Sequence, residues 1–147
     1  MNTLVTKNSI QIQKHQAIHA HMRFLVNAVG RLDLKSCLHI ADSNSLKNRI
    51  TLYRWSLLDF KEAIQRDTEL HKRLFPGNLL SKEMLRVSHE ILERINDAIA
   101  LADDAFREKI MREELNVILV KINLAVNAIC EAVKLNLTRE DELVKKS

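Results

Sequence analysis

The sequence predicts an all-α protein folded as an up-and-down four-helix bundle. Glycine (2) and proline (1) are almost absent from the 147 residues, which is too little turn chemistry for a β-rich fold. Hydrophobic residues make up 46% of the chain, and many recur at alternating steps of three and four, the spacing of one helix face. The length fits a single domain over 1–147, with short flexible ends expected at about 1–6 and 145–147.

Breaks in the pattern divide the chain into four helices. The first connection lies between Gly30 and the polar stretch 42–45, and the second is the tight break 76–78, after which Ser81 can cap a helix. A softer break falls at 102–104. The expected helices are 7–31, 45–74, 81–102 and 107–144.

The apolar stripes of the first two helices are interrupted by ionisable side chains. The stripe of the first helix contains His15 and His19 between Ile12 and Met22. The stripe of the second helix reads Leu46, Ile50, Tyr53, Leu57, Phe60 and Ile64. Continued at the same spacing, it passes through Asp67 and His71. A helix that packs in a bundle turns this stripe toward the core.

The last two helices carry polar residues on the same kind of stripe. In the third helix we expect Leu85, Leu92 and Ile99 to face inward, with His89 close to Leu85. The stripe of the fourth helix runs through its apolar residues to Asn136 and Glu140.

Antiparallel connections bring these polar residues to one end of the bundle. The set is His15, His19, Asp67, His71, His89, Asn136 and Glu140. Buried imidazoles and carboxylates need compensation, and they are the ligands of iron, manganese or zinc. The sequence therefore favours a metal site; the alternatives are a metal-free polar network or a helix rotated so that some of these residues face water.

The pattern resembles the hemerythrin-like (HHE cation-binding) domains, four-helix bundles that hold a non-haem di-iron centre. The resemblance extends over nearly the whole chain. It is carried by four short segments, namely His15–His19, the end of the second helix into Leu74-Phe75-Pro76, Ser88–Ile91 and Leu137–Glu142. It implies iron as the cofactor, with the histidines as nitrogen ligands and Asp67 and Glu140 as terminal or bridging carboxylates.

The chain departs from the family pattern on two helices. Members usually place His and then Glu on the second helix, where this chain has Asp67 and then His71. The family's His on the fourth helix is replaced by Asn136, a weaker ligand, and some members have a second His on the third helix, where this chain has Glu93. A single-ion or metal-free site is therefore also compatible with the sequence.

Three function classes follow from these observations. The first is a metal-binding protein that takes up dioxygen or another small diatomic, or senses iron or redox state, as the resemblance implies. The second is a degenerate, metal-free bundle acting as an interaction or regulatory module, with a homodimer as one form. An enzyme of the di-iron oxidase type comes third, because the chain has no nucleophile–base pattern or phosphate-binding glycine loop.

Composition argues against other partners. The 23 basic and 19 acidic residues are interspersed and aromatic residues are 4%, which does not indicate nucleic-acid binding. We expect no membrane span and no secretory signal, hence a cytoplasmic protein. Cys37 and Cys130 are expected to be reduced thiols, Cys130 near the core, and His21 and His39 to lie at the surface.

Overall fold

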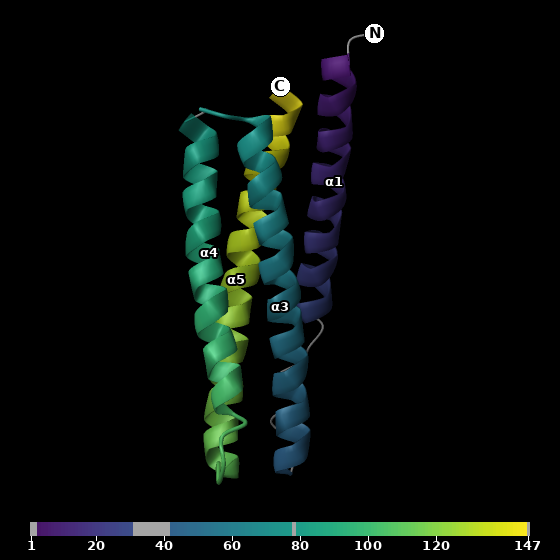
Figure 1. Ribbon diagram of the computed structural model, residues 1–147. Coiled ribbons are helices and arrows are strands. Elements are labelled where there is room, and N and C mark those ends of the chain that lie inside the picture. The colour runs from purple at the N-terminus through teal and green to yellow at the C-terminus, as the bar shows by residue number, and fades with distance from the viewer. Residues whose placement is uncertain (1–2, 31–41, 78, 147) are drawn as a thin grey trace.

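A computed structural model of the chain is a bundle of four long helices (Figure 1). It describes residues 3–30, 42–77 and 79–146, and these contain no strand. The helices are α1 (Thr3–Gly30), α3 (Ser43–Leu74), α4 (Leu79–Asp104) and α5 (Arg112–Lys146). The predicted all-α four-helix bundle is thus confirmed.

Consecutive helices run in opposite directions and pack side by side (Figure 1). Helix α1 packs against α3 and α5, and α4 packs against α3 and α5. Helices α3 and α5 also contact each other across the bundle. This topology brings the first half of α1, the end of α3, the start of α4 and the end of α5 to the same end of the molecule.

Local chemistry sets the helix ends. Asp42 caps α3, accepting a hydrogen bond from the Ser45 backbone N–H at 2.7 Å. After α3, the Phe75 N–H donates to the His71 carbonyl at 3.1 Å, and Gly77 has a φ of 79°, a conformation that glycine adopts without strain. Helix α1 begins at Thr3, within the end expected to be flexible, and α5 begins at Arg112 rather than at 107. Cys37 and His39 lie outside the described residues.

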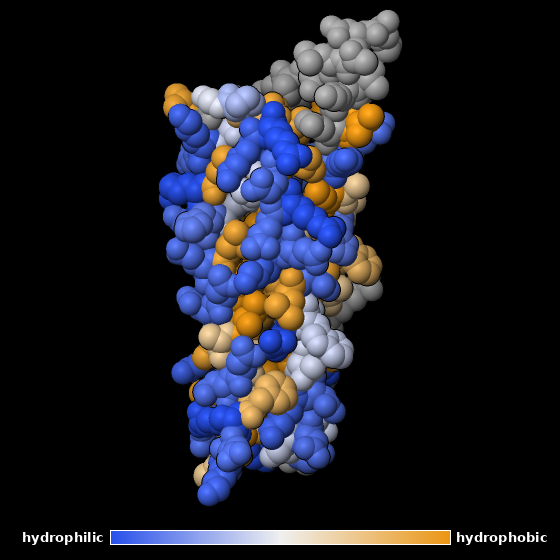
Figure 2. Space-filling view, in the orientation of Figure 1, coloured by the Kyte–Doolittle hydropathy of each residue, from blue (hydrophilic) through white to orange (hydrophobic). Residues whose placement is uncertain are grey.

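The core consists of the inward stripes of the four helices. Its largest fully buried side chains include Tyr53, Phe60, Ile95, Leu119 and Ile122. Cys130 is also buried there, as expected, and burial raises the pKa of its thiol to about 11. On the outer face seen in Figure 2, hydrophilic side chains predominate and hydrophobic ones are gathered along the middle of the molecule.

The inward stripe of α4 is one residue away from the predicted one. Its buried residues are Ser81, Met84, Ser88, Ile91, Ile95, Ala98 and Ala102. Ser81, which we expected to cap the helix, lies inside it, because α4 begins at Leu79. Leu85, Leu92 and Ile99 are only half-buried. A shift of one residue rotates a helix face by about 100°, so the face that carries His89 turns away from the core.

We expected no segment apolar enough to span a membrane, and helix α5 shows that this expectation is wrong. Arg112–Glu142 passes that test by length and composition, with a mean hydropathy of 1.6 in its most apolar window, of which 39% is buried. Core helices of soluble proteins pass the same test. The hydropathy is high because α5 is apolar on its core face and also carries exposed Val117, Leu124 and Leu135.

Two neighbouring leucines test this packing. Leu57 is 1% exposed and Leu58 is 38% exposed. We expect Leu57→Ala to lower the free energy of unfolding by about 2–5 kcal/mol, because it leaves a cavity in the core, and Leu58→Ala to lower it by less than about 1 kcal/mol. Urea denaturation measures both values. Equal losses would contradict the observed orientation of α3.

Candidate metal centre

Three helices bring a group of polar side chains into the core at the end of the bundle where α3 ends. Helix α1 contributes His15 and His19, spaced one turn apart so that both rings face inward. Helices α3 and α5 contribute the remaining members, which are Asp67, His71, Asn136 and Glu140. All six are predicted site residues, and each is between 1% and 7% exposed.

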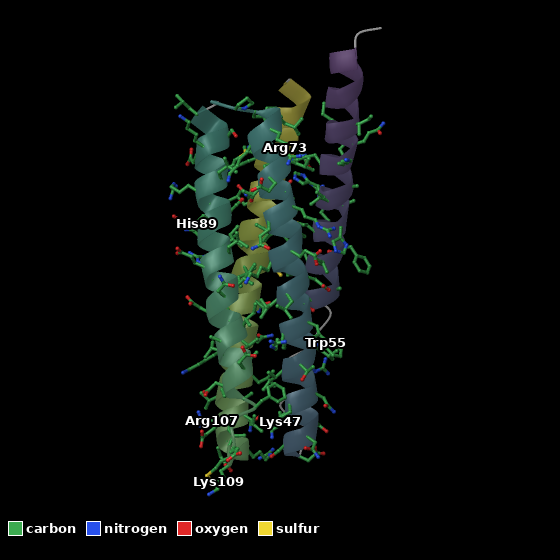
Figure 3. The ribbon with its side chains drawn as sticks, viewed as in Figure 1. Lys47, Trp55, Arg73, His89, Arg107 and Lys109 are labelled. Carbon is green, nitrogen blue, oxygen red and sulfur yellow. The ribbon has the colours of Figure 1, made fainter. Side chains whose placement is uncertain are left out.

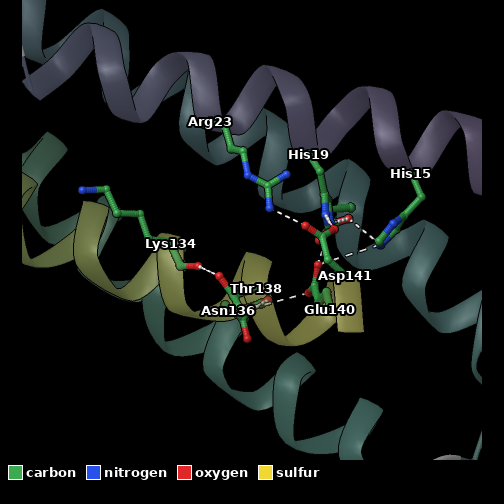
Figure 4. A network of polar contacts seen from close by, with 10 residues as sticks. His15, His19, Arg23, Lys134, Asn136, Thr138, Glu140 and Asp141 are labelled. Atoms are coloured by element: carbon green, nitrogen blue, oxygen red, sulfur yellow. Dashed lines mark hydrogen bonds and ion pairs between the residues drawn. The ribbon is translucent and has the colours of Figure 1, made fainter. Parts of the chain in front are cut away.

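Four of these side chains, His15, His19, Asp67 and Glu140, form a compact group. Figure 4 labels three of them, His15, His19 and Glu140. His19 Nε2 lies 2.9 Å from Asp67 Oδ1 and 2.7 Å from Glu140 Oε2. His15 Nε2 lies 3.1 Å from the same Asp67 oxygen and 3.8 Å from the same Glu140 oxygen. One donor atom from each residue lies within 4.8 Å of all the others.

These separations match the coordination shell of a single ion. Ligand atoms about 2.0–2.2 Å from a metal lie roughly 2.8–3.6 Å from their neighbours in octahedral or tetrahedral geometry. Four of the six pairwise separations are 2.7–3.8 Å, a spread slightly wider than that range, and all six are within 4.8 Å. Two imidazole nitrogens and two carboxylate oxygens suit iron, zinc or manganese.

Several buried polar atoms in this region have no hydrogen-bond partner among the described residues. They are both ring nitrogens of His15 and of His71, Asn136 Oδ1 and Glu140 Oε2. His15 Nε2 is close to Asp67, but the two groups are not aligned for a hydrogen bond. Each unsatisfied buried group costs about 1–3 kcal/mol, so these atoms favour an additional binding partner.

His71 borders the compact group. Its ring centroid lies 6.2 Å from that of His15 and 5.2 Å from that of Phe75. His71 is therefore placed to join the shell of a first ion, or to bind a second one, only after its ring moves.

Asn136 is held by a residue that sequence reasoning missed. Its side-chain amide donates to Ser88 Oγ at 3.0 Å and, at a longer 3.5 Å, to Glu140. Ser88 lies on the inward stripe of α4. Ser88 lies between Val87 and His89 in the sequence, and nothing in that context indicates that it faces the core.

A second missed pair fixes the orientation of the His19 ring (Figure 4). His19 Nδ1 lies 2.8 Å from Asp141 Oδ1, and the other oxygen of Asp141 accepts a hydrogen bond from Arg23. A carboxylate on one imidazole nitrogen directs the other nitrogen toward a metal. Asp141 adjoins Glu140, and Arg23 follows His19 by one helical turn, so both could have been found as neighbours of predicted ligands.

His89 does not join the cluster, contrary to the sequence prediction. Its side chain is 73% exposed and lies on the outer side of α4, where it contacts Glu93 at 3.1 Å (Figure 3). The reason is the one-residue shift of the α4 stripe described above. His21 is exposed, as expected.

Burial and close contacts displace the pKa values of the cluster. Burial disfavours charge on His19, but its bonds to Asp67 and Glu140 outweigh burial and raise its pKa to about 10. Burial would also raise the pKa of Asp67, yet contacts with His15 and His19 hold it well below its usual range. Burial raises the pKa of Glu140 to about 8 and lowers that of His71 to about 4. Near neutral pH, His19 and Glu140 are therefore protonated, Asp67 is ionised and His71 is neutral.

The space beside the cluster is small. A cavity of about 10 Å³ is lined by residues that include Asp67, Asn136 and Glu140. That volume is close to the minimum that accommodates one water molecule. Larger grooves of about 560 and 270 Å³ lie between α1 and α3 at the surface and include none of the cluster residues.

Comparison of the chain with protein-family models, with curated proteins and with solved structures gives no match in any of the three. The fold and the cluster therefore have to be interpreted from their own geometry and chemistry.

The displaced pKa values predict how the stability of metal-free protein depends on pH. The pKa values of His19 and Glu140 are raised on folding, so the stability linked to their protons is present at low pH and is lost as pH rises toward about 10 and 8. We expect the free energy of unfolding in the presence of a chelator to fall by about 1–2 kcal/mol per pH unit between about pH 6.5 and 8. Urea denaturation over a pH series measures this slope.

Glu140→Gln is the control for this pH series, because glutamine resembles the protonated acid but does not titrate. We expect the variant to keep only the slope contributed by His19, roughly half of the total. A stability that does not change over this pH range would contradict the protonation states assigned to the cluster.

Proposed function

We propose that this protein binds one transition-metal ion through His15, His19, Asp67 and Glu140. The observation that carries the proposal is the convergence of four buried donor atoms, all within 4.8 Å of one another, from three helices. Four ligands suit a single ion better than two ions, since a di-metal centre needs a larger ligand set. A bound cation would also balance the charge of Glu140 once this carboxyl group loses its proton.

The unpartnered polar atoms support a metal over a polar network that satisfies itself. Among the described residues, His15 has no aligned hydrogen-bond partner for either ring nitrogen, and the only close contact of Glu140 Oε2 that approaches hydrogen-bond distance is with His19 Nε2 at 2.7 Å. Both side chains have an atom in the compact group, where a cation would be their common partner. His71 and Asn136 lie beside the compact group and would complete the shell after a change of side-chain conformation, either directly or through a water.

Iron is the metal that we propose first, with zinc and manganese as alternatives. Two histidines with carboxylates form the ligand set of many non-haem iron sites. The resemblance to hemerythrin-like domains points in the same direction and suggests binding of dioxygen or another small diatomic, or sensing of iron or redox state. The cavity of about 10 Å³ has no room for an organic substrate, which favours such a role over an enzymatic one.

The alternative is a metal-free bundle that serves as an interaction module. The observation in its favour is that His19 already has bonding partners at both ring nitrogens, Asp67 at one and Asp141 at the other. In that case the cluster would be a structural network, and the functional surface would lie elsewhere on the molecule.

Metal-binding measurements on histidine variants separate these two functions. We expect the wild-type protein to bind about one equivalent of Fe²⁺ or Zn²⁺ in anaerobic equilibrium dialysis. His15→Ala is expected to weaken binding at least about 100-fold, because it removes a ligand. His89→Ala is the matched control, since it removes an exposed histidine from the same end of the bundle, and its affinity should equal that of wild type.

Binding of less than about 0.1 equivalent by the folded wild-type protein would overturn the metal proposal and favour the metal-free module. Equal loss of binding in His15→Ala and His89→Ala would show that the metal binds at a different place.

Proton release gives an independent test of which side chains bind the metal. His19 and Glu140 hold protons near neutral pH, with pKa values of about 10 and 8, and both must lose them to bind a cation. We expect about two protons to leave per ion bound at pH 7. Titration calorimetry in buffers of different ionisation enthalpy measures this number, and Glu140→Gln should reduce it by about one. Binding without proton release would contradict these ligands.

A further inference from the structure

We propose that two copies of this chain associate through the outward face of α5, packed antiparallel with the two-fold axis at the level of residue 126 along the helix. This proposal does not depend on the metal. Helix α5 lies behind α3 and α4 in the view of Figure 1, between α1 and α4. Its inward residues build the core, and the proposal concerns the opposite face of the same helix.

The outward face of α5 carries a straight apolar stripe. Val117 is 53% exposed, Leu124 is 64% exposed and Leu135 is 56% exposed, and Ala128 between them is also exposed. At 100° per residue, these four positions fall within about 40° of one line along the helix. Exposed apolar residues that are scattered singly need no explanation, but apolar residues aligned on one helix face, here with Lys121 and Glu131 between them, are typical of an interaction surface.

The stripe is complementary to the same stripe of a second copy whose α5 runs in the opposite direction. The members of each pair, Val117 with Leu135 and Leu124 with Ala128, are equally far in sequence from Val126. Val126 itself faces the core, so the two-fold axis passes at its level on the outward side of the helix and places each residue opposite its counterpart. The large Leu124 side chain meets the small Ala128, as helix packing of ridges into grooves requires.

The charges beside the stripe favour the same arrangement. Lys121 and Glu131 are also equally far from Val126 and are both exposed, so the antiparallel pairing brings each of them opposite the other residue of the partner. Glu113 and Arg139 are related in the same way farther out. Parallel pairing would instead oppose Lys121 to Lys121 and Glu131 to Glu131, which is repulsive. Among the described residues of one chain, Glu131 has only an exposed contact with Lys134 at 3.4 Å, which is worth little.

The size of the stripe sets the expected strength of association. From Glu113 to Arg139, at 1.5 Å per residue, the helix is about 39 Å long, and a face about 10 Å wide covers roughly 400 Å² per partner. That is about half of the standard protein–protein interface. We therefore expect a reversible dimer with a dissociation constant on the order of 10–100 µM rather than an obligate one.

A second copy fits this face better than a lipid surface does. Lys121 and Glu131 lie beside the apolar residues, and an oppositely charged pair there is costly in a membrane and favourable in a self-association. The opposite face of α5 provides Asn136, Glu140 and much of the core, so the helix could not enter a bilayer without unfolding the bundle.

Sedimentation velocity with charge-swap variants tests the dimer. It is run on the full chain with a chelator, at about 5–500 µM protein and low salt. We expect the wild type to dimerise over this range, and Leu124→Glu to weaken association at least about 10-fold. Lys121→Glu and Glu131→Lys should each weaken it about 10-fold, because each creates two like-charge contacts per dimer. The combined variant K121E/E131K should restore association to within about 3-fold of wild type.

Phe24→Glu is the matched control, since Phe24 is 65% exposed on α1 and lies outside the stripe. It should leave the dissociation constant unchanged, and circular dichroism should show that every variant remains helical. Wild type that stays monomeric, a combined variant that does not recover, or an equal effect of Phe24→Glu would each overturn the proposal. Monomeric protein that floats with phosphatidylcholine–phosphatidylglycerol vesicles, and loses this ability in Leu124→Glu, would overturn it in favour of a lipid surface.

Discussion

The contacts of His19 with two buried carboxylates hold one end of this bundle together. Through Asp67 the ring connects α1 to α3, and through Glu140 and Asp141 it connects α1 to α5. Without these contacts the polar layer would separate three helices that pack well along the rest of their length. Because a single imidazole serves all three partners, its position fixes the relative rotation of α1, α3 and α5 at this level.

The same contacts cost folding free energy, and they gather groups that could bind a cation. A buried ion pair such as His19–Asp67 does not repay its desolvation by attraction alone, and the unpartnered atoms of His15 and His71 add to that cost. The long apolar stripes along the rest of the bundle can offset such a cost. A cation among these groups would convert the costly layer into ligands, with the Asp141–Arg23 pair holding His19 in the required orientation.

Helix α5 serves two environments at once. Its inner face ends in Asn136 and Glu140, and its outer face carries the apolar stripe with Lys121 and Glu131 beside it. This division explains why the helix is apolar enough to resemble a membrane span by composition although fewer than half of the residues in its most apolar window, 39%, are buried. The site and the proposed dimer surface therefore lie on opposite faces of one helix and share no side chains. A change in the position of α5 would nevertheless affect both.

The fold and most of the site followed from the sequence by itself. The scarcity of turn residues predicted four helices, and the spacing from Leu46 to Ile64 defined the inward face of the second. Continued along that helix, the same spacing predicted that Asp67 and His71 lie in the core with His15 and His19. The face of α4 did not follow, because Leu85, Leu92 and Ile99 fit the helical spacing as well as the buried Met84, Ile91 and Ala98 do. Only packing against α3 and α5 selects among faces one residue apart, and it excluded His89 while adding Ser88. Spacing along one helix records which residues share its face, but which face is buried, and which atoms then meet, depends on the neighbouring helices.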